Sequence, residues 1–157
     1  MARKRQKWAV GDLFSIPVGS SCGLGQVISA EPDAMNSVLC VYFSHLVPCD
    51  QLGLISPKVS DSISIQLTTR ESLDSGSWKV IGTAEPLDTS DEFPLERLRK
   101  NGFIGAKVRG SGIMDALVSV FHGLSPWDEY ADPEYFTKLL RPGVAVPGAA
   151  IFSKMSP

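Results

Sequence analysis

The sequence predicts an α+β domain, in which an N-terminal twisted antiparallel β-sheet or partly open barrel of about five or six strands precedes two C-terminal helices. Short segments typical of strands fill the first two thirds of the chain, whereas clear helical periodicity is confined to its last third. The chain has 157 residues, 43% of them hydrophobic and 20% charged. This length and composition are typical of one globular domain with its own core.

The first predicted element is a β-hairpin over residues 8–28. Apolar and polar residues alternate over residues 13–18, and a second strand is expected over residues 24–29. Residues 19–23 between them are rich in glycine and serine, which favour turns. Pro17 has no backbone N–H to donate, so the first strand is expected to lie at a sheet edge or to end there.

Gly23 and Gly25 form a G-x-G pair that resembles part of a phosphate-binding loop. The third glycine of the motif is absent, because residue 28 is isoleucine, and no helix is predicted to follow. We therefore expect a tight turn and a glycine that allows another strand to approach closely.

The later strands are predicted from their apolar patterns. Residues 37–45 are apolar on both faces, which is typical of a central strand. Residues 62–68 alternate strictly, with the polar positions expected to face solvent. Further strands are expected at 77–83 and 103–108, and a short helix at 94–101.

Two helices are expected near the C-terminus. Residues 111–122 carry an apolar stripe at helical spacing, although the β-branched Val118 and Val120 leave a buried strand as an alternative. A second helix is expected to begin with Asp132 as its N-cap and to end at residues 141–143. Residues 144–152 are then expected to form a final short strand.

Charge and cysteine content bear on location and partners. Four basic residues lie within residues 1–7, predicted to be a flexible basic tail, and residues 8–157, the predicted domain, hold 11 basic against 17 acidic residues. This acidity favours a basic protein partner over nucleic acid. The three cysteines are odd in number and widely spaced, so free thiols and a cytoplasmic location are expected. No apolar run is long enough to span a membrane, and no membrane partner is expected.

Two groups of residues invite a catalytic or metal-binding interpretation. The three residue types of a hydrolase triad, Asp, Ser and His, occur along one predicted helix. Their order puts serine between the acid and the base, whereas a triad needs the base in the middle, and no G-x-S-x-G motif is present. A possible zinc set lacks the usual cysteine spacing. We therefore expect no catalytic residues, no metal, no cofactor and no enzymatic activity. The residues tested are Asp115, Ser119 and His122 for the triad, and Cys40, His45 and Cys49 for zinc.

The loop over residues 123–130 places aromatic residues beside acidic ones, a mixture found at protein interfaces. The alternative for the tryptophan is burial beneath the two helices. The candidate partner-binding residues are Trp127, Asp128, Glu129, Tyr130 and Asp132.

Three stretches in this order resemble the immunity protein 26 family of bacterial polymorphic-toxin systems. They are GDLFSIPVGSSCGLGQV at 11–27, WKVIGTAEP at 78–86 and FHGLSPWDEYADPEYFTKLL at 121–140. The resemblance implies a non-enzymatic cytoplasmic antidote that binds and neutralises a cognate toxin, and it transfers no catalytic residues. Two alternatives remain: a β-barrel that binds a small ligand or nucleic acid through the basic tail and the G-x-G turn, and an enzyme that uses the helix carrying Asp115.

Overall fold

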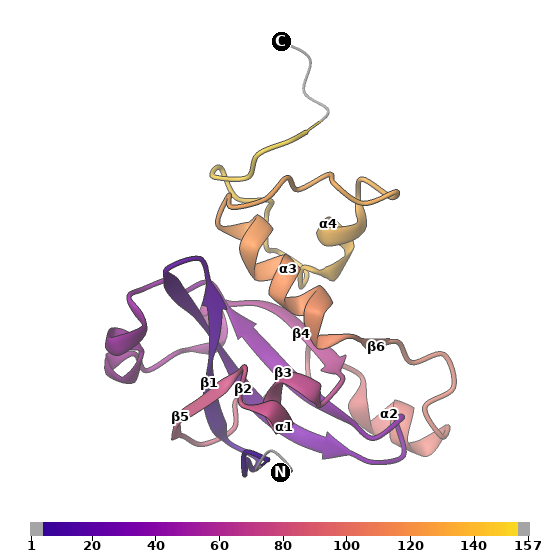
Figure 1. Cartoon of the computed structure of the whole chain (residues 1–157). Coiled ribbons are helices and arrows are strands. Elements are labelled where there is room, and N and C mark those ends of the chain that lie inside the picture. Colours follow the sequence, from indigo (N-terminus) through magenta and orange to yellow (C-terminus); the bar gives the residue numbers. More distant parts are fainter. Residues whose placement is uncertain (1–4, 154–157) are drawn as a thin grey trace.

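The computed structural model describes residues 5–153, and over this range it shows an open, six-stranded sheet that confirms the α+β class (Figure 1). The strand order is β5-β1-β2-β3-β4-β6, with every pair antiparallel except β4 and β6. The strands are β1 (Asp12–Val18), β2 (Ser21–Glu31), β3 (Ser37–Phe43), β4 (Ser62–Thr68), β5 (Lys79–Thr83) and β6 (Val108–Arg109). The helices are η1 (Cys49–Leu54), η2 (Val59–Asp61), α1 (Glu71–Ser75), α2 (Leu95–Lys100), α3 (Ser111–Phe121) and α4 (Tyr135–Leu139).

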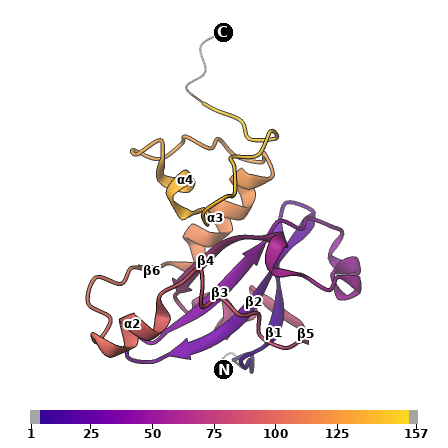
Figure 2. The same ribbon diagram turned by 180° about the vertical axis from the view of Figure 1, so that it is seen from behind.

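The sheet buries apolar side chains on both of its faces. Helices α3 and α4 lie on the same side of the sheet, as the views from front and back agree (Figures 1 and 2). The core between these helices and the sheet contains the Phe14 ring stacked on the Trp78 ring, with ring centroids 5.0 Å apart. Leu52 of η1 and Phe93 belong to the second core, on the other face. Because β3 lies between two cores, all seven of its residues are buried, as predicted for a central strand.

The polar side chains of β4 do not face solvent, and the prediction of a half-exposed strand is wrong. Ser64 and Thr68 are fully buried because the C-terminal region covers their face. The Ser64 hydroxyl donates to the Leu139 carbonyl at 2.6 Å, and the hydroxyls of Thr68 and Tyr42 are hydrogen-bonded at 2.7 Å. Each buried hydroxyl therefore has the partner that burial requires.

The hairpin prediction is confirmed in its main features. Strand β1 lies between β5 and β2, so the expectation of an edge strand is wrong. Strand β5 pairs only with residues 12–15, so Pro17 pairs with Cys22 of β2 and has no partner on β5. A Cβ atom at Gly25 would lie 2.4 Å from Cζ of Phe14, its partner on β1. The G-x-G pair is therefore part of a strand, and Gly25 makes room for the Phe14 ring.

The C-terminal segments differ from prediction in length. Residues 111–121 form a helix, which settles the helix-or-strand alternative. Helix α4 begins later than expected, because the Asp132 carboxylate accepts the backbone N–H of Glu134 in a turn that precedes the helix. The strand expected at 144–152 is reduced to a single bridge at Ile151, and that expected at 103–108 to the two residues of β6.

A disulfide joins Cys22 to Cys49, so the prediction of free thiols is wrong for these two residues. Cys22 and Val47 exchange backbone hydrogen bonds of 2.9 and 3.1 Å, which bring the following residues back against the start of β2. The sequence separation of 27 residues conceals this proximity. Cys40 is a free thiol, as predicted, and lies buried in the core.

Candidate functional site

Trp127 belongs to the core and not to the protein surface. Its side chain is 2% exposed and packs against Phe136 with ring centroids 6.0 Å apart. The indole Nε1 donates to the hydroxyl of Thr137 at 3.0 Å. The prediction of Trp127 as an exposed anchor for a partner is therefore wrong, and the alternative of burial beneath the helices is confirmed.

Asp128 is also buried, at 6% exposure, and its carboxylate accepts the backbone N–H of Ser153 at 2.7 Å and the hydroxyl of the same residue at 2.9 Å. It ties the loop to the segment that follows α4, so its prediction as an exposed contact is also wrong. Glu129 and Asp132 are exposed. The hydrogen bond from Lys138 lowers the pKa of Asp132.

Tyr130 is half-buried, with its ring centroid 4.8 Å from that of Phe136. Burial raises the pKa of its hydroxyl, and the neighbouring Tyr135 and Glu129 add to this effect. Of the five predicted contact residues, Glu129, Tyr130 and Asp132 thus have surface available to a partner.

Of the three residues tested for a triad, Asp115 has a structural contact. The Asp115 carboxylate accepts the indole N–H of Trp78 at 2.7 Å, which ties α3 to the sheet. Burial raises the pKa of Asp115 and lowers that of His122. Cys49 is bonded to Cys22 and so is not free to bind zinc in this structure, and Cys40 lies buried in the core, where burial raises the pKa of its thiol to about 12.

A groove of about 270 Å³ lies between η1 and the segment that follows β5. We call it the acidic groove, because the adjoining segment 84–94 carries four acidic residues and no basic one. Its apolar lining comes from β1, β5 and both flanking segments. The lining residues used below are Leu13, Gln26, Leu52, Ile81, Glu85 and Leu87.

Gln26 builds one wall of the acidic groove. Its side chain is buried on β2, and Nε2 donates to the carbonyls of Ala84 and Glu85 at 3.4 and 3.2 Å. Its Oε1 accepts the backbone N–H of Leu87 at 3.2 Å. One buried amide thereby holds a segment without regular secondary structure against the sheet.

The opposite wall is η1, fixed at its first residue by the Cys22–Cys49 disulfide and in its middle by the buried Leu52. Leu54 at its end is 85% exposed but is not among the residues that line the groove. Glu85 lines the groove and is exposed. The groove thus combines apolar lining residues with the exposed carboxylate of Glu85.

A second depression, the N-terminal cleft, lies between residues 5–10 and the start of α1, with a volume of about 670 Å³. Gln6 anchors the chain there. Its Nε2 donates to the carbonyls of Leu73 and Trp78 at 2.8 Å each, and its Oε1 accepts the N–H of Val80 at 3.0 Å. The described end of the predicted tail is therefore attached to the domain, whereas residues 1–4 lie outside the described range.

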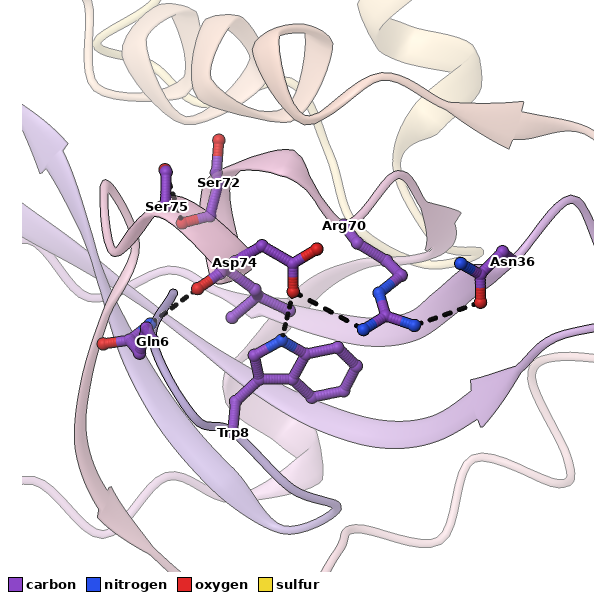
Figure 3. Close-up of polar contacts among 8 residues, drawn as sticks. Gln6, Trp8, Asn36, Arg70, Ser72, Asp74 and Ser75 are labelled. Atoms are coloured by element: carbon purple, nitrogen blue, oxygen red, sulfur yellow. Dashed lines mark hydrogen bonds and ion pairs between the residues drawn. The ribbon is translucent and has the colours of Figure 1, made fainter. Parts of the chain in front are cut away.

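Trp8, Asp74, Arg70 and Asn36 form a continuous polar chain beside this cleft (Figure 3). The Trp8 indole donates to Asp74 at 2.8 Å, and Arg70 lies 3.5 Å from the same carboxylate oxygen. The guanidinium also donates to Asn36 at 3.0 Å and stacks 4.9 Å from the centre of the Trp8 ring. Four contacts thus hold an aromatic ring and a cation in fixed positions.

Sequence reasoning missed both depressions. One signal was present for the first, since Gln26 falls between Leu24 and Ile28 on one face of a predicted strand, where an apolar residue is expected. A polar residue at such a position has to find partners when buried. No comparable local signal marks Gln6, whose partners lie 67 or more residues away in sequence.

Comparison with protein-family models, with curated proteins and with solved structures found no match. Over residues 5–153, no helix has both the length and the apolar character needed to cross a bilayer. Within the same range, no three His, Cys, Asp or Glu side chains are grouped so as to hold a metal ion.

Proposed function

We propose that this protein is a non-enzymatic immunity protein that binds and neutralises a cognate bacterial toxin. The acidic groove is the observation that carries the proposal, because apolar residues line it and the adjoining segment 84–94 carries negative charge. The resemblance of the sequence to an immunity family supplies the functional class. The toxin would bind through a basic, extended segment.

The electrostatics of segment 84–94 support a basic partner. Glu85, Asp88 and Asp91 are exposed, while Glu92 is paired with Arg141 at 2.7 Å. Exposed charges of one sign speed the association of an oppositely charged partner more than they tighten the final complex. Binding of a basic toxin such as a nuclease in this way would cover its active site and block access of substrate.

The cellular location remains a prediction. A cytoplasmic antidote is expected from the resemblance, whereas the Cys22–Cys49 disulfide is typical of an oxidising compartment. Counting free thiols in protein isolated from its native cells under acid quench decides the point. One thiol per chain, that of Cys40, indicates an oxidising compartment, and three indicate the cytoplasm.

The proposal is tested by co-expression. The DNA flanking this gene is first sequenced for a large neighbouring open reading frame, and the C-terminal domain of its product is then expressed in a host cell with or without this chain. We expect growth arrest by that domain alone and rescue by the chain, together with a stoichiometric complex of the two purified proteins. Failure of the two proteins to bind each other would overturn the assignment to this partner.

Variants then locate the contact surface. Charge reversal by Glu85→Lys and Asp91→Lys together is expected to slow association by about tenfold at low salt. The matched control is Glu71→Lys, an exposed reversal on α1. Glu129→Lys tests the loop predicted from sequence. If only that variant slows association, the toxin contacts the loop, and the acidic groove is not the site.

A further inference from the structure

We propose that the N-terminal cleft binds the phosphate group of a nucleotide, with the base stacked on Trp8. The cleft shares no lining residue with the acidic groove, so this inference is independent of the proposed toxin contact. Its volume of about 670 Å³ lies within the range of small-molecule sites.

The charge of the cleft favours an anion. Arg5, Lys7 and Arg70 line it, and Asp74 is the one acidic residue among its lining residues. Arg5 and Lys7 are exposed, while Gln6 between them is committed to the backbone of the neighbouring strand and helix. Because Gln6 anchors the backbone of this segment beside the cleft, a ligand has to order only the side chains of the two cations.

The aromatic wall distinguishes a nucleotide from a simple anion. Trp8 lines the cleft and is half-buried; its indole N–H donates to Asp74, and the Arg70 guanidinium lies over the ring, 4.9 Å from its centre (Figure 3). Planar bases stack on aromatic side chains, and cations beside the ring bind the phosphate. An acidic peptide would use the cations but would leave the indole face without a planar partner.

The experiment uses the full chain and three probes, inorganic phosphate, adenosine monophosphate and a short single-stranded oligothymidylate. Trp78 and Trp127 are buried, so quenching of tryptophan fluorescence by a nucleotide reports mainly on Trp8. We expect both nucleotide probes to bind more tightly than inorganic phosphate. Equal affinity per site for adenosine monophosphate and the oligothymidylate indicates that the ligand is a free nucleotide. Tighter binding of the oligothymidylate indicates that the ligand is single-stranded nucleic acid.

The double variant Arg5→Glu, Lys7→Glu is expected to weaken nucleotide binding by at least about tenfold, because two charge-assisted contacts are reversed. For the oligonucleotide, log affinity falls with log salt concentration, and the steepness of this fall should decrease by about 1.4 in the double variant, because two phosphate contacts are lost. Lys107→Glu, an exposed reversal outside the cleft, is the matched control. Absence of nucleotide binding, equal loss in the control, or equally tight binding of polyglutamate would each overturn the proposal.

Discussion

Removal of the Cys22–Cys49 disulfide gives the sharpest test of how the fold is stabilised. The variant Cys22→Ala, Cys49→Ala releases a loop of 27 residues in the unfolded chain. In the loop-entropy model, closing a loop of this length stabilises the folded state by about 3.5 kcal/mol at 25 °C. For a domain of this size, that loss corresponds to a fall in Tm of roughly 10 °C. The change is large against the roughly 5–15 kcal/mol of total stability typical of a domain.

The measurement is unfolding in guanidinium chloride, followed by circular dichroism for the oxidised protein, the reduced protein and the double variant. Addition of a reductant should destabilise the wild-type chain and leave the variant unchanged, which is the control for other effects of the reagent. Trypsin cleavage after the exposed Lys58 should also accelerate, because η1 is no longer fixed at Cys49. Unfolding at the same denaturant concentration in oxidised and reduced protein would refute the reasoning.

Two further predictions concern buried contacts. Glu31 is 4% exposed and receives two hydrogen bonds from Arg99, which lower its pKa. The free energy of unfolding of the wild-type protein should therefore fall as the pH drops below 4.5, the pKa of Glu31 in the unfolded chain, and through its lower pKa in the folded protein. Arg99→Ala should cost about 1–3 kcal/mol at pH 7 in urea unfolding and progressively less as the pH falls through the folded pKa of Glu31, because the carboxylate becomes protonated there; a cost that does not change with pH would contradict the ion pair. Gly25→Ala should cost about 1–3 kcal/mol by overpacking against Phe14, measured by thermal unfolding, whereas the control Gly82→Ala meets no atom within 4 Å and should change little.

Much of the fold could be predicted from short-range pattern. The strands at 13–18, 37–45 and 62–68 and the helix at 111–122 were recognisable because side chains repeat at period 2 or 3.6 wherever one face is buried. The same patterns could not say how many faces of β4 are buried. The alternating pattern predicted that the serines and the threonine of β4 face solvent, whereas in the structure they are buried and Ser64 donates to the Leu139 carbonyl of the C-terminal region.

The candidate site was predicted less well. Trp127 and Asp128 have the composition of an interface loop, yet both are buried, because composition does not record which neighbour a side chain packs against. Glu129 and Asp132 are exposed as expected of acidic residues. The acidic groove could not be predicted from the sequence, because its walls come from four segments that are far apart along the chain.

The sequence by itself determined the α+β class and the positions of the main strands and of helix α3, because these depend on residues that are neighbours along the chain. The order of all strands before all helices was wrong, since η1, η2, α1 and α2 lie between strands. Tertiary structure alone decided the Cys22–Cys49 pairing, the anchoring of Gln6 and the two depressions. Gln6 and Trp78 are 72 residues apart, and no local pattern specifies such a contact. It forms when packing of the sheet leaves a backbone carbonyl that needs a donor at that place.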